Sequence, residues 1–237
     1  MAIGYRTLQA NTTGVANTAI GDAALFGNIT GSRNVGIGQA ALAFNTANND
    51  NIGIGENAGH GTAANYDRCI LIGTATFNRA TSGSDNILIG DHVISGALTA
   101  GAIGNGNVVL GSQALSNSVT GNNNIILGYN AHNVNGAIGD SNISLGANSS
   151  FSTVVSNTTL IGTGMSTGLS NVAIIGKSTQ NVIVGITTGA SDNGQRLQVN
   201  GNATFIVAEY ADNAAATTAG LPIGALYRTG DNLKIVH

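Results

Sequence analysis

The residues that could do acid–base chemistry are few and scattered. The chain holds 11 acidic residues in 237, and glycoside cleavage needs two carboxylates within about 5–10 Å. Only Glu209 and Asp212 are close in sequence, and we expect them on the solvated face of a short helix. Asp22, Glu56 and Asp91 each follow a recurring glycine, where we interpret them as surface decoration. The acidic residues therefore predict no catalytic pair within one chain.

Two glycine-rich stretches superficially match nucleotide-binding motifs. Residues 53–58 read Gly-Ile-Gly-Glu-Asn-Ala, and residues 176–178 read Gly-Lys-Ser. Such loops need a strand before them and a helix after them, which neither stretch has. The four histidines lack metal-ligand spacing, and a lone cysteine, Cys69, excludes a disulfide framework and a cysteine-based zinc site. We expect no catalytic residue, no cofactor and no metal, and thus a protein that is not an enzyme.

The composition points to short strands and tight turns. Charged residues make up 8% of the chain, against about 25% in ordinary globular domains. The chain has 35 glycines and one proline, and its net charge of −3 offers no basic field for nucleic acid. No apolar run is long enough for a membrane helix, and the first residues lack the pattern of a secretory signal. We expect a soluble body without a nucleic-acid partner or membrane insertion.

A sequence repeat must position whatever surface the chain presents. Short aliphatic segments that end in glycine recur mostly every 17 residues. A period this short fits one coil of a parallel β-solenoid with two short strands. We predict an all-β fold, a parallel β-solenoid (β-roll) of about 17-residue coils, over residues 1–187. The glycines that end the segments are Gly4, Gly21, Gly38, Gly55, Gly73, Gly90, Gly111, Gly128, Gly146, Gly162, Gly176 and Gly185.

Alternation along each segment predicts which side chains face the interior. We place the residues one and three before the glycine, such as Ile52 and Ile54, inside the coil, and the residue two before it outside. The glycine itself bends the chain at positive φ, where a Cβ is not tolerated. An Ala-Leu pair after the glycine, such as residues 24–25, is predicted to form the second strand.

Asparagine recurs four residues before the glycine in most coils. Stacked coils place equivalent side chains about 4.8 Å apart, which lets amides bond along a ladder. We interpret these asparagines as a structural turn ladder in preference to a polar binding stripe, and Cys69 in the same position as an inert thiol. The ladder consists of Asn17, Asn34, Asn51, Asn86, Asn107, Asn124, Asn142 and Asn181.

The residue predicted to point outward is small in the first four coils and mostly large and aliphatic afterwards. A soluble monomer rarely exposes such a stripe, and strands that are apolar on both faces normally have both faces covered. We predict that other copies of the chain cover it; three copies are the simplest closed arrangement, and two remain an alternative. The predicted trimer interface consists of Leu71, Leu88, Val109, Ile126, Leu160, Ile174 and Ile183.

The repeat ends after Gly185, and the remaining residues read differently. Ala-rich sequence followed by glycine and proline predicts a short helix, and two aliphatic segments around a turn predict a hairpin. We expect helix and hairpin to cap the open edge of the solenoid. The predicted segments are transition strands in 188–207, and a C-terminal cap in 208–237 that comprises the helix in 208–219 and a hairpin of 223–228 with 233–237.

The repeat resembles that of a known class of protein. The pattern Asn-x-Ala-Ile-Gly-x-x-Ala at residues 17–24 is similar to the head repeats of trimeric autotransporter adhesins, which use a shorter coil, and to β-rolls of bacteriophage fibres. This resemblance covers residues 1–187 and implies a homotrimer. Residues 208–237 are similar to the ends of phage structural and fibre proteins, and they include the sequence Ala-Gly-Leu-Pro-Ile-Gly-Ala-Leu-Tyr-Arg-Thr-Gly-Asp at 219–231.

The C-terminal residues favour the phage class. A surface-anchored autotransporter is expected to end in membrane-spanning strands of about ten residues, whereas this sequence ends in a predicted hairpin. We expect a structural and adhesive trimeric fibre of a virion that helps host attachment, with other virion proteins at its N-terminal end. A host glycan or protein receptor would contact exposed side chains. The candidate contacts are Tyr5, Tyr66, Tyr129, Tyr227 and Arg228.

Three alternatives to this hypothesis stay open. The first is a purely architectural fibre or capsid decoration protein without a receptor. The second is a bacterial trimeric adhesin head. The third is a polysaccharide depolymerase whose carboxylates meet between subunits, an arrangement that sequence spacing does not reveal.

Overall fold

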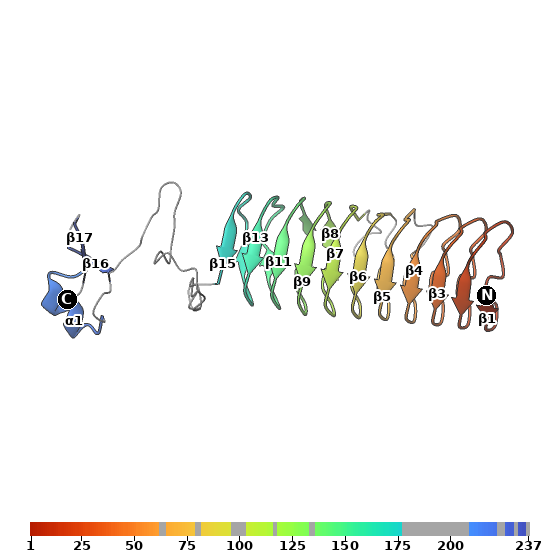
Figure 1. Ribbon diagram of the computed structural model, residues 1–237, viewed down its shortest axis with the longest axis horizontal. Helices are drawn as coiled ribbons and strands as arrows, with labels where there is room; N and C mark the ends of the chain where they lie inside the picture. Colours follow the sequence, from red (N-terminus) through yellow and green to blue (C-terminus); the bar gives the residue numbers. More distant parts are fainter. Residues whose placement is uncertain are drawn as a thin grey trace, which may run out of the picture. The chain divides into compact units, whose positions relative to one another are not determined.

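The computed structural model describes most of the repeat region and part of the C-terminal region. The described residues are 1–61, 65–78, 82–95, 103–115, 118–132, 136–176, 209–221, 226–229 and 232–235. The chain forms two compact units, Met1–Val182 and Ile183–His237. The first unit is an all-β parallel solenoid with a repeat near 17 residues (Figure 1), which confirms the predicted fold class.

Eleven short strands form one parallel sheet along the solenoid, seen as a row of arrows in Figure 1. Each strand pairs with its counterpart in the next coil in register, so that Leu71 lies beside Leu88 and Ile70 beside Ile87. The regular spacing of the glycines sets this register. The strands are β1 (Ala2–Ile3), β2 (Thr18–Ile20), β3 (Val35–Ile37), β4 (Ile52–Ile54), β5 (Ile70–Ile72), β6 (Ile87–Ile89), β7 (Val108–Leu110), β9 (Ile125–Leu127), β11 (Ile143–Leu145), β13 (Thr159–Ile161) and β15 (Ala173–Ile175).

The sheet faces opposite to the sequence prediction. In the middle strands the central residue is buried and its two neighbours are partly exposed. Leu71 and Leu88 are fully buried within one chain, while Ile3 and Ile161 are 55% and 38% exposed. Alternation separates two faces but does not say which one is enclosed. The interior of this coil is narrow and admits one column of sheet side chains.

The small central residues of the early coils make room for leucines from the preceding turn. A Cβ on Gly53 would lie 2.6 Å from Cγ of Leu42, and one on Gly36 would lie 3.2 Å from Cγ of Leu25. Leu25 and Leu42 are fully buried. From β5 onward leucine, valine or isoleucine fills most of these central positions instead, so each coil balances its sheet and turn residues to fill the same volume.

The segment after the glycine is a run of tight turns, and the predicted second strand at residues 24–25 is wrong. Ala23 and Leu25 have φ values of 54° and 48°. The Ala24 amide donates to the Gly21 carbonyl at 3.3 Å, while the Leu25 amide donates to the next coil. Residues with left-handed backbone conformation thus alternate along this segment. They bend the chain and still let every second amide bond to the neighbouring coil. Short second sheets form later, between β8 (Ser118–Thr120) and β10 (Gly136–Ile138), and between β12 (Ser150–Phe151) and β14 (Ser166–Thr167).

The glycine that ends each strand behaves as predicted. Gly21 has a φ of 125°, and a Cβ there would lie 2.6 Å from the carbonyl oxygen of Gly38 in the next coil. Both the backbone conformation and the closeness of the next coil therefore require glycine.

The C-terminal unit contains a short helix and a hairpin, as expected. Helix α1 (Asn213–Thr218) starts later than predicted because Asp212 caps it, its side chain accepting from the Ala215 amide at 2.8 Å. Strands β16 (Leu226–Thr229) and β17 (Asn232–Ile235) pair antiparallel. Glu209 lies outside the helix and pairs with Arg228, so Glu209 and Asp212 do not share a helix face.

Among the residues that the structure describes, no helix is both long and apolar enough to cross a membrane.

Candidate functional site

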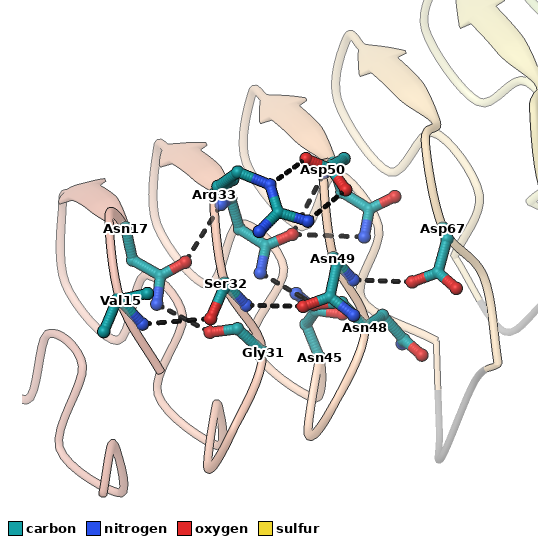
Figure 2. A network of polar contacts seen from close by, with 12 residues as sticks. Val15, Asn17, Gly31, Ser32, Arg33, Asn45, Asn48, Asn49, Asp50 and Asp67 are labelled. Carbon is teal, nitrogen blue, oxygen red and sulfur yellow. Dashed lines mark hydrogen bonds and ion pairs between the residues drawn. The ribbon is translucent and has the colours of Figure 1, made fainter. Parts of the chain in front are cut away.

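The asparagine ladder lies inside the coil, at the edge of the sheet where each strand begins. The side-chain oxygen of Asn17 accepts from the Asn34 amide at 2.9 Å, and that of Asn34 accepts from the Asn51 amide at 3.0 Å. The Asn34 side-chain nitrogen donates to the Asn48 carbonyl at 2.8 Å. Because these side chains are buried, each amide satisfies backbone groups that water does not reach. The bonds bear out the structural interpretation of the ladder (Figure 2).

The ladder continues along most of the solenoid. The same amide-to-side-chain bond joins Asn86 to Asn107, Asn107 to Asn124, Asn124 to Asn142, and Asn142 to Thr158. The predicted member Asn181 lies outside the described residues. At Cys69 a thiol replaces the amide and contacts the Gly83 carbonyl at 3.3 Å. Burial raises the pKa of this thiol to about 11, which agrees with its interpretation as unreactive.

A second ladder, which sequence analysis missed, runs along the outside of the same edge. Here the backbone amide of one coil donates to a Ser, Asn or Asp side chain six residues before the glycine of the next. The Val15 amide donates to Ser32 Oγ at 3.0 Å, the Ser32 amide to Asn49 Oδ1 at 2.9 Å and the Asn49 amide to Asp67 Oδ1 at 2.6 Å (Figure 2). Its direction is opposite to that of the buried ladder, so each coil is held to both neighbours. The recurrence of Ser, Asn or Asp six residues before the glycine could have indicated this ladder in the sequence.

Two ion pairs stand between the ladders. Arg33 and Asp50 form two hydrogen bonds, the second at 2.7 Å between Nη2 and Oδ2, and Arg68 repeats this with Asp85. The Arg33 guanidinium lowers the pKa of the Asp50 carboxyl through its hydrogen bond. All four side chains are exposed, so solvent screens the pairs and their contribution to stability is small.

The exposed face of the long sheet is mostly aliphatic, with threonine at two positions; we call it the aliphatic face. None of its residues is buried, and Ile125 and Ile175 are 37% and 54% exposed. Its two columns are the residues one and three before each glycine. The first is Ile3, Ile20, Ile37, Ile54, Ile72, Ile89, Leu110, Leu127, Leu145, Ile161 and Ile175; the second is Thr18, Val35, Ile52, Ile70, Ile87, Val108, Ile125, Ile143, Thr159 and Ala173.

The predicted trimer-interface residues therefore do not form a surface. Five of them are fully buried inside a single chain, where their side chains fill the coil; Ile174 is partly buried against the same core, and Ile183 lies outside the described residues. Another copy cannot reach side chains that this chain already encloses. The five buried residues are Leu71, Leu88, Val109, Ile126 and Leu160.

The predicted receptor contacts do not come together either. Tyr66 is buried, donates to the Gly59 carbonyl at 3.0 Å and packs edge-on against Phe77. Tyr5 and Tyr129 are 76% and 55% exposed but follow β1 and β9, which are many coils apart. In the second unit Arg228 pairs with Glu209 at 2.6 Å, and the side chain of Tyr227 lies outside what the structure describes. Of the described residues in this set, Tyr5, Tyr129 and Arg228 are exposed, and Tyr66 is buried.

The chemistry-bearing side chains remain dispersed in the fold. Asp22, Glu56 and Asp91 are exposed on separate coils. Within the described ranges, no three His, Cys, Asp or Glu residues group closely enough to hold a metal ion. His132 is buried, accepts the Phe151 amide at Nδ1 (3.0 Å), and has its pKa lowered by burial to about 4.

Comparisons with protein-family models, curated protein sequences and solved structures give no match for this chain. The functional proposal therefore rests on the sequence repeat and the C-terminal residues together with the fold and the surfaces described above.

Proposed function

We propose that the protein is a structural, adhesive fibre segment of a phage or phage-like particle, that three copies assemble side by side, and that the assembly helps attachment to a host surface. In this proposal the chain is a structural part and not an enzyme. The class rests on the resemblance of the repeat and of residues 208–237 to fibre proteins. The assembly rests on the aliphatic face.

The aliphatic face supports assembly because of its size and continuity. Eleven strands at about 4.8 Å spacing make it about 50 Å long, and two side-chain columns make it about 10 Å wide. An apolar patch of about 500 Å² reaches the upper range found on monomers, where such patches often mark interaction sites. Charged residues are missing from both columns. Water contact along this strip is costly, and burial against copies of the same strip removes the cost.

Three copies suit this strip because it is long and narrow. Three sheets can turn their strips to a common axis and enclose one another, while the outer ladder and the turns stay in water. The resemblance to trimeric heads also favours three. A bundle of parallel solenoids gives a stiff rod, and three equivalent surfaces on it raise the avidity of a weak contact.

The native mass of the intact chain, measured by light scattering, tests the assembly. A trimer has a mass of about 71 kDa, three times 23.6 kDa. Ile89→Lys, in the middle of the aliphatic face, is expected to reduce the mass to that of one chain. Asp91→Lys, exposed on the adjoining turn, is the matched control and leaves the trimer intact. A wild-type monomer, or a trimer that tolerates lysine at both Ile54 and Ile89, would refute the proposed seam.

Fibre function needs a separate measurement. Purified protein is expected to compete with intact particles for adsorption to host cells, and antibodies against it to label an appendage by electron microscopy. A protein that assembles but neither labels particles nor competes would contradict the adhesive role.

A further inference from the structure

A strip of aromatic and cationic side chains crosses the turn surface of the first four coils. Arg6, Phe26, Phe44 and His60 come from consecutive coils, and we call them the aromatic strip. The Arg6 guanidinium lies over the Phe26 ring at 4.5 Å, and the rings of Phe44 and His60 meet edge-on with centroids 4.6 Å apart. The Gly27 amide donates to the Ala43 carbonyl at 2.7 Å, which places the coils of Phe26 and Phe44 side by side.

The fold does not require these rings. Phe26 and His60 stand five residues after the strand-ending glycine of their coils, and Phe44 stands six residues after it. At position five, other described coils carry the polar residues Gln9, Asn78 and Ser95, whereas Phe151 at this position is buried. The rings are also not enclosed: Phe44 is 38% exposed, and Phe26 and His60 are partly exposed. In a repeat protein, a solvent-facing departure from the repeat is where a binding site can be added without changing the fold.

Each ring stands beside a small residue. Phe26 is followed by Gly27, Phe44 is preceded by Ala43, and His60 is followed by a glycine. These small neighbours let adjacent coils approach closely, since a Cβ on Gly27 would lie 2.9 Å from the Ala43 carbonyl oxygen. The strip spans three coils of rings, about 10 Å at the spacing between strands, which is the scale of a disaccharide.

We propose that the aromatic strip binds an oligosaccharide. The C–H face of a sugar ring is apolar and packs flat on an aromatic ring, while its hydroxyl groups need hydrogen-bonding partners. The Arg6 Nε donates to Gln9 at 3.2 Å, and among the described residues no acceptor contacts its two terminal nitrogens. Those nitrogens can donate to sugar oxygens, including the carboxylate of an acidic sugar.

The size of the strip favours a sugar over a protein partner. A stable protein interface buries about 800 Å² on each side. Three rings that are already partly buried offer less than the roughly 150–250 Å² that each full aromatic side chain can bury. The strip therefore suits a short, narrow ligand. This inference deepens the proposed attachment role, on which its biological meaning rests, and it replaces the tyrosines as the predicted receptor contacts.

The test is binding of the intact chain to a printed array of neutral and uronic-acid oligosaccharides, bacterial O-antigen repeats and capsular repeats. Phe44→Ala and Phe26→Ala are each expected to weaken binding to the best array ligand at least tenfold. Phe44→Leu is expected to weaken it similarly, since leucine keeps an apolar side chain but removes the ring. Tyr129→Ala, which removes an exposed aromatic residue from a distant coil, is the matched control and binds as wild type.

Thermal unfolding first shows that every variant is folded. Absence of binding to any array oligosaccharide at millimolar concentration would overturn the inference. So would a Phe44→Leu variant that binds like wild type, because an apolar protein contact would then explain the surface better. The native mass of the same samples separates the two proposals: a trimer that binds no sugar refutes this inference alone, and a sugar-binding monomer refutes the trimeric fibre alone.

Discussion

Substitution of one buried asparagine tests how the coils are held together. Asn34 is fully buried, and its side-chain oxygen accepts from both the backbone and side-chain nitrogens of Asn51, at 3.0 and 3.2 Å. Its side-chain nitrogen donates to the Asn48 carbonyl at 2.8 Å. Asn34→Ala removes these bonds and leaves the Asn51 amide without an acceptor in a place closed to water.

The expected cost follows from these contacts. A buried donor left unsatisfied costs about 1–3 kcal/mol, and each hydrogen bond lost contributes about 1 kcal/mol. The Asn51 side chain keeps its bond to the Tyr66 carbonyl at 3.2 Å, which limits the loss. We expect Asn34→Ala to lower the free energy of unfolding by about 2–4 kcal/mol.

Urea unfolding followed by circular dichroism measures this change, with the slope against urea showing whether both proteins unfold as the same unit. The matched control is Ser32→Ala in the outer ladder. Its Oγ accepts from the Val15 amide, but Val15 is 63% exposed and water can replace the bond. We expect a loss below about 1 kcal/mol there. Equal losses in the two variants, or a loss below 1 kcal/mol for Asn34→Ala, would refute the claim that burial makes the inner ladder decisive.

Three further predictions concern single sites. Cys69→Asn is expected to raise the free energy of unfolding by about 1–2 kcal/mol because it restores the side-chain amide of the ladder. An unchanged or lower unfolding midpoint would contradict the claim that Cys69 interrupts the ladder. Gly21→Ala is expected to prevent stable folding because its Cβ meets the next coil. Gly220 has a φ of 86°, and a Cβ there would have no atom within 4 Å, so Gly220→Ala should cost only about 1–2 kcal/mol of backbone strain. Thermal unfolding compares the two variants. The His132 side chain takes up a proton near pH 6.5 in the unfolded chain, but only near its pKa of about 4 in the folded chain. The contribution of His132 to the free energy of unfolding is therefore complete above pH 6.5. It falls by up to about 3 kcal/mol as the pH drops to 4. His132→Asn should lose this dependence in acid unfolding curves and His92→Gln should keep it, and the reverse pattern would disprove the assignment.

Much of the architecture was predictable because the repeat is both short and regular. Residues aligned on the strand-ending glycines in sequence are the residues that pair in the sheet, as Leu71 does with Leu88. The positive φ of Gly21 and the ladder bonds of Asn17 and Asn34 follow from the same alignment. In a solenoid each coil contacts only its neighbours, so a local pattern fixes most of the long-range contacts.

The outward face was predicted wrongly although the sequence contained a clue to it. The ladder asparagine and the residue two after it are separated by an even number of positions, so in an extended segment they point to the same side. Asn51 is buried within the ladder, and the central residue of its strand shares that side. The ladder and the facing prediction were therefore inconsistent with each other. Consistent use of the ladder would have placed Leu71 inside and Ile72 outside.

The sequence by itself determined the period, the register of the sheet, the corner glycines and the buried ladder, because each depends on residues at fixed spacing along one coil. Only the tertiary structure decided that left-handed turns replace the second strand, and that Arg6 meets Phe26 and Phe44 meets His60 on the turn surface. These outcomes depend on how closely neighbouring coils approach and on how much side-chain volume one narrow coil can hold. Volume and closeness are properties of the packed chain, and spacing along the sequence does not specify them.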